Sequence, residues 1–507
     1  MPGTNGHTTG SDSPTHLPLR RSDDIQGDIL AGFRKDHQCL LMIGFEDTGM
    51  ARRWLEVILP EIATTRAVAE YNSAFSAMRR KLKGADPAGL SAHWTGLSVT
   101  YPGLVLLAGA TPFPTAVSRP PSFQAFREGP AVRAWQVGDI GAGSPAHWQF
   151  GAARNPVVHA VLTLASDDPR RLAAAVARHG SLIAAHEATV VFRQDGATLP
   201  GGLRGHDHFG FADGVSQPGV RGFDEPDPAD PETVLGKPGT GILPASRFVI
   251  GVDEPAEALP RWSIGGSFQV IRRLAQDVAG WHAQFGPQLA ALKHSGAAPD
   301  SADDGWLAAR LVGRWPSGTP IARCPGADVP PASGELLGND LGHADGPNGV
   351  RTPRFSHLRK TSPRDDQSFL PQKDPAASFA GSDPRRIIRR GIPFGPVFDP
   401  RSADPSHGPD TPRGLLFICY QSDLVEQFEF LQHLRINNTR FPMRTVGGDR
   451  VAGNVSRARF GNPADRAGRS TLLSADSFVR TEGALYAFSP AIPVLRDLAQ
   501  GNMTDLL

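Results

Sequence analysis

Gln38-Cys39-Leu40-Leu41-Met42-Ile43-Gly44-Phe45 is an apolar run whose length fits a buried strand. A helix-like stretch follows from Thr48 to Leu59 and stops before Pro60, which lacks the backbone N–H that a continuing helix needs. The two segments together predict a strand followed by a helix. The beginning of the chain therefore indicates a fold that combines strands with helices.

Strand and helix alternate again in the first half of the chain. Val157 to Ala165 predicts a strand, Asp167 to His179 an amphipathic helix that ends at Gly180, and Ala188 to Arg193 another strand. The repeated order of strand, helix and strand favours an α+β module.

The second half repeats this order. Phe248 to Gly251 and Ser267 to Arg272 predict strands, and Gln276 to Phe285 predicts a helix. Gly414 to Gln421 predicts a strand that runs directly into a helix from Asp423 to Leu434. Two halves with similar order predict two α+β modules packed together, although no sequence repeat connects them.

Irregular segments lie between these elements. Residues 219–241 are rich in Gly, Pro and Asp and predict a long functional loop or a domain boundary. Residues 295–412 contain few long periodic runs, and a long irregular region inside a compact enzyme usually surrounds a site. Residues 1–22 have the composition of a disordered tail, with order expected to begin near Asp24.

The amino-acid composition limits which classes of partner the protein is expected to bind. The 507 residues include 52 Lys and Arg against 51 Asp and Glu, so no net charge attracts nucleic acid or an anionic membrane. Small-molecule partners fit better, and the sequence is compatible with a monomer or a homo-oligomer. Arg20-Arg21 is followed by no apolar segment, and no run approaches the roughly 20 apolar residues of a membrane span. A cytoplasmic location is therefore expected.

Three motifs carry residues suited to chemistry. Gly210-Phe211-Ala212-Asp213-Gly214-Val215-Ser216-Gln217-Pro218 predicts a tight turn that points Asp213 outward, although Asp also caps helices and closes Asx-turns. His357, among apolar neighbours, fits either a hydrogen-bonded core residue or a ligand. Ile387-Ile388 before Arg389 predicts a half-buried strand, and an Arg drawn inward needs an anionic partner.

In these motifs the sequence resembles the dye-decolorizing (DyP-type) haem peroxidases, and in particular their long-chain branch. The segments that carry the resemblance are Asp23–Leu30 (DDIQGDIL), Gly210–Pro218 (GFADGVSQP), Ala308–Trp315 (AARLVGRW), His357–Arg364 (HLRKTSPR), Ile387–Gly395 (IIRRGIPFG), Gly414–Phe417 (GLLF) and Glu482–Phe488 (EGALYAF). Several separated motifs in the same order make a chance match improbable.

The resemblance implies two ferredoxin-like domains of the dimeric α+β barrel type, with long irregular loops around a haem pocket. Residues 23–225 would form the domain that carries a distal Asp, and residues 240–507 the domain that binds haem b (iron protoporphyrin IX). The implied function is a peroxidase that uses hydrogen peroxide to oxidise small phenolic or dye-like aromatic donors. Such a protein would bind no nucleic acid and no membrane.

The resemblance also assigns roles to single residues. His357 would be the proximal iron ligand, Asp213 the distal acid–base residue that assists heterolytic O–O cleavage, and Arg389 the distal arginine. Leu415 and Phe417 are two apart on one strand, so they share a face and would line the distal pocket, or belong to an ordinary core. Arg359 could reach a haem propionate or form an ion pair elsewhere.

Two alternatives remain open at this point. The first is a haem-binding carrier or sensor with little turnover, although storage needs neither a distal acid nor a distal arginine. The second is a non-haem metal site formed by Gly205-His206-Asp207-His208 together with Asp213, because two His at i and i+2 share one strand face. His-x-His is a weak signal, and such residues are more often hydrogen-bonded in loops.

Overall fold

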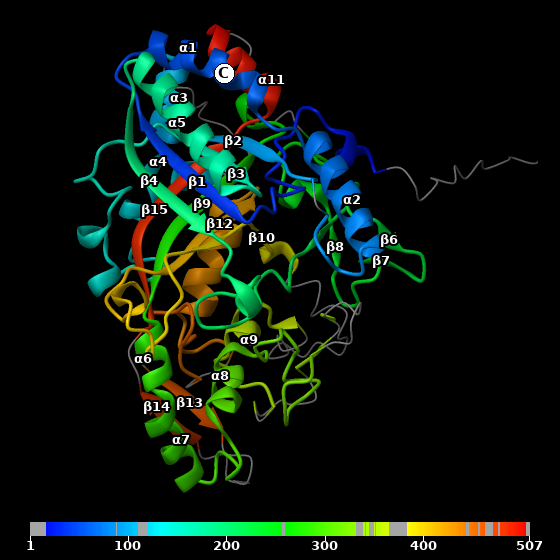
Figure 1. The fold of residues 1–507 in the computed structure, drawn as a ribbon, viewed down its shortest axis with the longest axis vertical. Helices are drawn as coiled ribbons and strands as arrows, with labels where there is room; N and C mark the ends of the chain where they lie inside the picture. The colour runs from blue at the N-terminus through cyan, green and yellow to red at the C-terminus, as the bar shows by residue number, and fades with distance from the viewer. Residues whose placement is uncertain are drawn as a thin grey trace, which may run out of the picture.

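A nine-stranded antiparallel sheet runs through the centre of the protein (Figure 1). The computed structural model describes residues 17–87, 89–109, 120–255, 259–330, 338–339, 341–343, 349, 351–364, 383–442, 446–454, 457–461, 470–474 and 477–502. Along the sheet the strands follow the order β10-β12-β9-β15-β2-β3-β1-β4, and β11 also pairs with β12. No helix in the described part of the chain is both long enough and apolar enough to cross a membrane.

The first half of the sheet has the strand order β4-β1-β3-β2, which is that of a ferredoxin-like module. Its elements are β1 (His37–Gly44), α1 (Thr48–Ile58), α2 (Thr65–Lys81), β2 (His93–Thr100), α3 (Tyr101–Ala108), α4 (Pro120–Val132), β3 (Ala160–Ser166), α5 (Pro169–Ala185) and β4 (Thr189–Ala197). Asp47, Thr64, Thr100 and Asp168 each accept a hydrogen bond from the first turn of the helix that follows, as N-cap residues do. The capped helices and antiparallel strands give the predicted α+β order.

The second half repeats that strand order. Its elements are β9 (Ser267–Gln276), α6 (Val278–Ala283), α7 (Phe285–His294), α8 (Asp304–Val312), α9 (His357–Thr361), β10 (Ile388–Arg389), β11 (Ile392–Phe394), β12 (Gly414–Gln421), the π-helical segments η11 (Leu424–Glu429) and η12 (Leu431–Ile436), β13 (Arg457–Gly461), β14 (Ser470–Ser474), β15 (Val479–Ser489) and α11 (Ile492–Gln500). Read in the same direction, β10-β12-β9-β15 occupy the places of β2-β3-β1-β4. The prediction of two α+β modules is confirmed, while the boundaries at residues 225 and 240 stay a prediction.

The two halves meet in a short join and at their far edges. Between β15 and β2 the register comprises Ala487 opposite Thr100 and Phe488 opposite Val99. At the other edge, a Cβ on Gly196 of β4 would lie 2.6 Å from the Ile392 side chain of β11, so only glycine permits this approach. The sheet therefore curves until its ends touch. Residues 219–243, which contain the short strands β5 (Gly219–Val220), β6 (Pro226–Asp227), β7 (Asp230–Val234) and β8 (Ile242–Leu243), connect the halves.

Both faces of the sheet are buried at β1 and β3 in the first half. In β1, Cys39, Leu41 and Ile43 belong to one apolar cluster, and Leu40 and Met42 belong to a second cluster on the other face. This two-sided burial explains why the strand reads as a continuous apolar run without alternation. Each fully buried side chain of this kind contributes about 1.5–3 kcal/mol relative to exposure.

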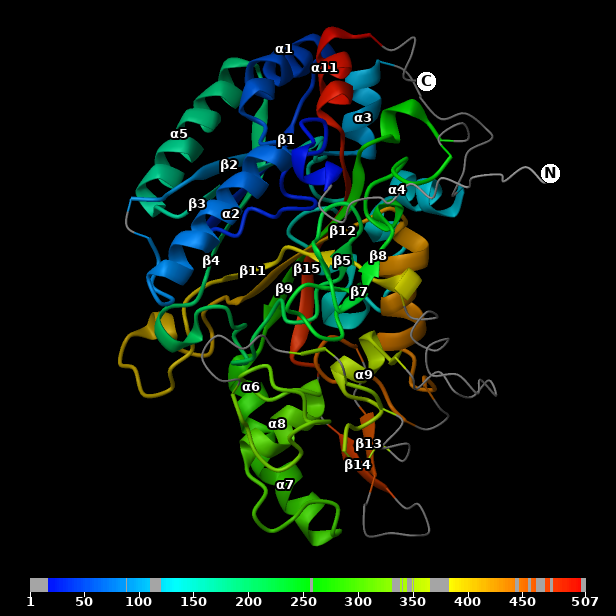
Figure 2. The same cartoon turned by 90° about the vertical axis from the view of Figure 1, so that its right-hand side faces the viewer.

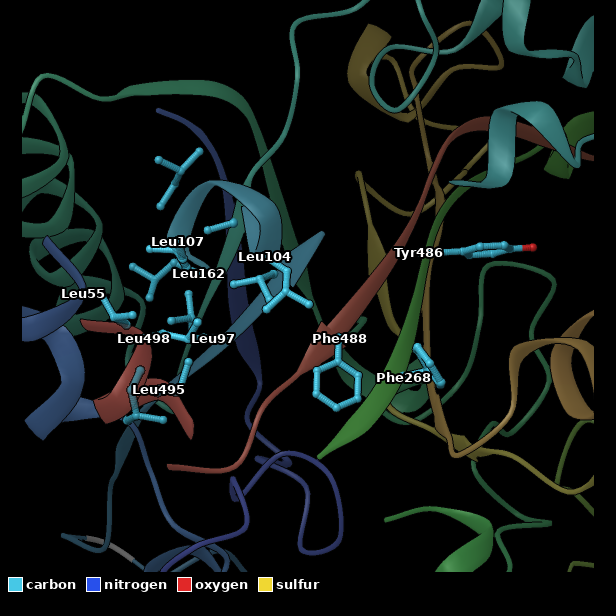
Figure 3. Packing of buried hydrophobic residues seen from close by; sticks show 14 of the residues in the cluster. Leu55, Leu97, Leu104, Leu107, Leu162, Phe268, Tyr486, Phe488, Leu495 and Leu498 are labelled. Atoms are coloured by element: carbon cyan, nitrogen blue, oxygen red, sulfur yellow. The ribbon is translucent and has the colours of Figure 1, made fainter. Parts of the chain in front are cut away.

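The first cluster is shared between the halves. Figure 3 shows Phe268 of β9 and Phe488 of β15 in the same packed group as Leu97 of β2 and Leu162 of β3. Helix α11, which ends the described chain, returns to pack on α1, and Figures 1 and 2 show these two helices at one end of the molecule. Helices α6, α7 and α8 lie with β13 and β14 at the opposite end.

Some of the predicted elements are wrong in extent. Helix α5 continues through Gly180 to Ala185, because a single glycine costs a helix about 1 kcal/mol and burial of Ile183 offsets it. Phe248–Gly251 is a buried turn with Gly251 at φ 80°, so its apolar side chains reflect a core position and no strand. The helix predicted from Asp423 to Leu434 is π-helical and continues to Ile436.

The ordered chain also begins earlier than predicted. Pro18–Arg21 form one turn of 3₁₀ helix, the Leu19 N–H donates to the Gly222 carbonyl at 3.0 Å, and Arg20 Nε donates to the Phe223 carbonyl at 2.6 Å. These bonds tie the segment to the link between the halves. Residues 1–16 of the predicted tail lie outside the described residues.

Candidate active site

A cavity of about 930 Å³ lies against the second half of the sheet. Its wall includes side chains from three neighbouring strands, Leu415 and Phe417 of β12, Arg272 of β9 and Thr481 of β15. Pockets of roughly 300–1,000 Å³ hold cofactors and drug-sized ligands. The lining residues that matter below are Asp207, Asp213, Arg272, Arg314, His357, Arg386, Arg389, Leu415, Phe417, Ile436, Val451 and Thr481.

Asp213 reaches the cavity from a loop that is closed by its own hydrogen bonds. The Asp213 N–H donates to the Gly205 carbonyl at 3.0 Å, and the Phe211 N–H donates to Asp207 Oδ1 at 2.9 Å. Gly210 and Gly214 have φ values of 89° and 74°, which side chains rarely adopt, so the turn needs glycine on both sides of Asp213. The predicted tight turn is confirmed.

Arg389 lies close to Asp213 at the cavity wall. It is the second residue of β10, and because neighbouring residues of a strand point to opposite faces, buried Ile388 anchors the strand while Arg389 points away from that core. Its Nη2 lies 3.8 Å from Asp213 Oδ1, and the two side chains are 28% and 40% exposed. The groups are close enough to attract each other but are not in direct hydrogen-bond contact.

His357 lines the cavity as the first residue of α9. Its Nδ1 lies 2.7 Å from Oδ2 of Asp449, whose side chain is fully buried. Burial alone would raise the pKa of Asp449, but the adjacent His357 and the N–H groups of Val451 and Ala452 lower that pKa below its ordinary value. An ionised carboxylate at Nδ1 keeps the proton on that nitrogen, so Nε2 is left with a lone pair for a ligand.

Sequence reasoning missed Asp449. It follows Gly447 and Gly448 in a segment with no recognised motif, and it lies far from His357 along the chain. No spacing rule connects a histidine at the start of one helix with an aspartate in a distant turn. The contact becomes visible only in three dimensions.

Leu415 and Phe417 both line the cavity and are half-buried, and they share one face of β12 as predicted. Arg359 is placed differently. Its side chain is fully buried, its Nη1 donates to the Thr352 carbonyl at 2.6 Å, and it is not among the residues of the cavity wall. Successive helical residues are about 100° apart around the helix axis. Arg359 comes two residues after His357, so its side chain projects to the opposite side of α9. The predicted propionate contact of Arg359 therefore has no support in the geometry.

Other arginines occupy the wall instead. Arg314 donates to Asn339 Oδ1 at 2.6 Å, to Ser216 Oγ at 3.0 Å and to the Gly318 carbonyl at 2.8 Å. Burial, with smaller contributions from neighbouring arginines, lowers the pKa of Arg314 to about 9. Arg386 donates to the Ser216 carbonyl at 2.9 Å. Several cationic side chains around one cavity favour an anionic occupant.

The alternative metal site receives no support. His208 Nε2 lies 2.9 Å from the Phe394 carbonyl, and His206 Nδ1 lies 3.2 Å from the Arg204 carbonyl. Within the described ranges no group of three or more His, Cys, Asp or Glu is arranged to hold a metal ion. Asp207 does line the cavity, where burial and the nearby charge of Asp213 raise its pKa to about 6.

Comparison with known proteins gives a consistent result. The profile of the "DyP dimeric alpha+beta barrel domain" matches residues 24–200. The chain is 30% identical to a dye-decolorizing peroxidase of Mycena epipterygia, with 94% of this chain and 86% of that protein covered, and equally so to one of Auricularia auricula-judae. The solved structure of an ancestral D-type dye-decolorizing peroxidase superposes with a TM-score of 0.76 at 28% identity, covering 96% and 99% of the two chains. A dye-decolorizing peroxidase in complex with 2,6-dimethoxyphenol superposes with a TM-score of 0.74 at 26% identity, covering 95% and 99%.

Proposed function

Because the chain belongs to the dye-decolorizing (DyP-type) peroxidase family, we propose that it uses hydrogen peroxide to oxidise phenolic and dye-like donors at the cavity beside β12. The names of its relatives refer to dyes, and one similar structure holds a phenol, 2,6-dimethoxyphenol. The observation that carries the proposal is that Asp213, His357 and Arg389, from three distant motifs, line one cavity.

The residues of the cavity fit haem b, on which this family depends. Apolar side chains such as Leu415, Phe417 and Ile436 offer surfaces for a flat macrocycle, and Arg314 and Arg386 offer cations for its carboxylates. His357 offers Nε2 to the iron. When bound, haem supplies the iron centre at which peroxide is reduced and to which donors give up electrons.

His357 and Asp449 would act as a unit in holding the cofactor. The hydrogen bond from Nδ1 fixes the orientation of the imidazole ring and increases the electron-donating power of Nε2. Because Asp449 is buried and also accepts hydrogen bonds from the Val451 and Ala452 backbone at 2.8 and 3.1 Å, it cannot turn away from His357 without leaving those donors unpaired.

Asp213 moves the proton of peroxide. Its Oδ1 accepts a hydrogen bond from the Gly214 N–H at 2.6 Å, which leaves Oδ2 for a proton from one peroxide oxygen. The same oxygen then delivers that proton to the departing peroxide oxygen, directly or through one water. General acid–base catalysis of this kind contributes typically 10²–10⁴-fold.

Arg389 stabilises the negative charge that grows on the departing oxygen. The guanidinium is always charged and is held by a strand, so no reorganisation is needed when the charge develops. The 3.8 Å gap between Arg389 and Asp213 leaves both groups able to bond to a small molecule between them. Leu415 and Phe417 on the same wall limit the access of water.

The test is steady-state turnover by haem-loaded protein with hydrogen peroxide and 2,6-dimethoxyphenol or an anthraquinone dye. Wild type is expected to oxidise both donors. Asp213→Asn should bind haem normally and lose about 10²–10⁴-fold in kcat/KM for peroxide. Normal haem binding without peroxide-dependent turnover in the wild type would instead identify a carrier or sensor.

A further inference from the structure

Gln217 makes two hydrogen bonds with the backbone of Arg389. Its Nε2 donates to the Arg389 carbonyl at 2.9 Å, and its Oε1 accepts from the Arg389 N–H at 3.1 Å. The side chain thus pairs with the outer edge of β10 in the way that a neighbouring strand would. The Arg389 carbonyl also receives Arg390 Nη1 at 3.4 Å.

The bonded glutamine lies four residues after Asp213 on the same loop. The residues between them are also fastened to the second half of the chain. The Val215 carbonyl accepts from Asn339 Nδ2 at 3.1 Å, and the Ser216 carbonyl accepts from Arg386 Nη2 at 2.9 Å. Pro218 then restricts the backbone immediately after Gln217. The loop that carries the carboxylate is therefore joined to the residue that carries the guanidinium.

The hydrogen bonds between Gln217 and Arg389 can keep the Asp213 carboxylate and the Arg389 guanidinium apart. A free carboxylate and guanidinium close to a bidentate pair with N···O distances of about 2.7–2.9 Å. In the structure they stand 3.8 Å apart. If they closed on each other, each would satisfy the other, and neither would be free to bond to peroxide.

We propose that Gln217 is a positioning residue for the peroxide reaction, which holds the Arg389 backbone so that its guanidinium and the Asp213 carboxylate stay apart at a spacing that admits peroxide. This inference rests on the proposed function. It extends that function to a residue that touches neither peroxide nor haem. A displacement of about 1 Å at such a pair can reduce rates by about 10²-fold.

A second glutamine, Gln26, provides a control for the substitution of Gln217. Gln26 makes the same reciprocal pair with Leu97 of β2, because its Nε2 donates to the Leu97 carbonyl at 2.8 Å and its Oε1 accepts from the Leu97 N–H at 2.9 Å. Its Nε2 also donates to the Pro490 carbonyl at 2.8 Å. Gln26 and Leu97 do not line the cavity. Loss of this bond reports what a purely structural clamp contributes.

The experiment compares Gln217→Met, Gln217→Glu and Gln26→Met as haem-loaded full-length proteins. Gln217→Met keeps the side-chain length and loses both bonds, so its second-order rate constant with peroxide should fall 10–100-fold, with an altered pH profile. Haem affinity and the KM for 2,6-dimethoxyphenol should stay within twofold of wild type. Gln217→Glu retains the acceptor for the Arg389 N–H and should recover part of the rate. Gln26→Met should lower the melting temperature and leave the peroxide rate unchanged.

A second measurement is independent of turnover. A crystal structure of Gln217→Met should show the Asp213 and Arg389 side chains in direct contact. Should that variant fail to fold, Gln217→Leu, which also loses both bonds to the Arg389 backbone, serves in its place. An unchanged spacing, an unchanged peroxide rate, or an equal loss of rate in Gln26→Met would overturn the proposal. If the wild type turns over and any of these results is found, only the role of Gln217 is contradicted. If the wild type does not turn over, the proposed function itself is contradicted.

Discussion

The two halves of the central sheet share one strand order but differ in what their strands bury. In the first half, every residue of β3 is buried, and β1 contributes apolar side chains to clusters on both faces. In the second half, β9, β12 and β15 direct Arg272, Leu415, Phe417 and Thr481 toward a cavity. The same strand order therefore forms a packed core in the first half and the wall of a site in the second half.

The difference shows that strand order alone does not create the site. What creates it is the choice of side chains on one face of three adjacent strands, together with loops long enough to bring Asp213 and His357 over that face. Substitutions in the first half should then change stability and leave the chemistry intact, and substitutions of Arg389 and Asp449 at the cavity should chiefly change the chemistry. Three changes test this division, and a fourth tests how pH affects stability at the cavity.

The largest expected effect lies in the packed half. Leu162→Ala removes a side chain with 0% exposure from the centre of β3, and the cavity left behind should reduce the free energy of unfolding by about 2–5 kcal/mol. Urea denaturation measures the loss. Peroxide turnover per folded molecule should match wild type, and a specific loss of turnover well below the unfolding midpoint would break the division between the halves.

At the cavity, Arg389→Leu should decrease kcat/KM for peroxide by about 10²–10³-fold, because the charge on the departing oxygen loses its partner. Stopped-flow mixing with peroxide gives the rate constant. The control is Arg171→Leu in the first half, a 62% exposed arginine 3.9 Å from Asp168. Comparable losses in the two variants would show that the effect is not local to the cavity.

Asp449→Asn should weaken haem binding by about 10–100-fold, since residues that orient a metal ligand typically contribute that much. Transfer of haem to an acceptor apoprotein measures the change. Asp28→Asn is the matched control, because Asp28 is equally buried and bonds to Tyr420, away from the cavity. Equal haem loss from both variants would contradict a specific role for Asp449.

The smallest effect concerns pH and Asp207. Burial raises the pKa of this carboxyl to about 6 from an ordinary value near 3.8. The folded protein therefore binds a proton more tightly than the unfolded chain, and the stabilisation is lost as pH rises from about 4 to about 6. Asp207→Asn should remove this dependence, on the order of 1 kcal/mol after allowance for solvent screening. Denaturation of both proteins at pH 4, 5, 6 and 7 gives the free energy of unfolding at each pH. The same change of this free energy with pH in wild type and Asp207→Asn would contradict the prediction.

Much of this arrangement could be predicted from sequence, for identifiable reasons. Gly414–Gln421 forms β12 with the predicted limits, because a buried apolar strand bounded by polar residues leaves few alternatives. Asp213, His357 and Arg389 stand in motifs that can be recognised along the chain, although what each does at the cavity stays a prediction. The predicted contact of Arg359 with a haem propionate has no support in the geometry, because adjacency to His357 in sequence says nothing about which side of α9 a residue faces.

The remaining features depend on contacts between distant segments. Asp449 meets His357, and Gln217 meets Arg389, through hydrogen bonds that leave no periodic or spacing signal in either partner. Short polar bonds of this kind are decided by how the loops pack after the strands are in place. For this reason the strands could be predicted more completely than the residues that orient the site.

The site is tested most directly by titrating haem into the wild-type protein and His357→Ala, followed by the Soret absorption band. The wild type should saturate at one haem per chain. His357→Ala should lose that band or bind haem far more weakly, and added imidazole should restore the wild-type spectrum because it replaces the missing ligand. A variant that binds haem with the affinity and spectrum of the wild type would contradict the assignment of His357 and the site built around it.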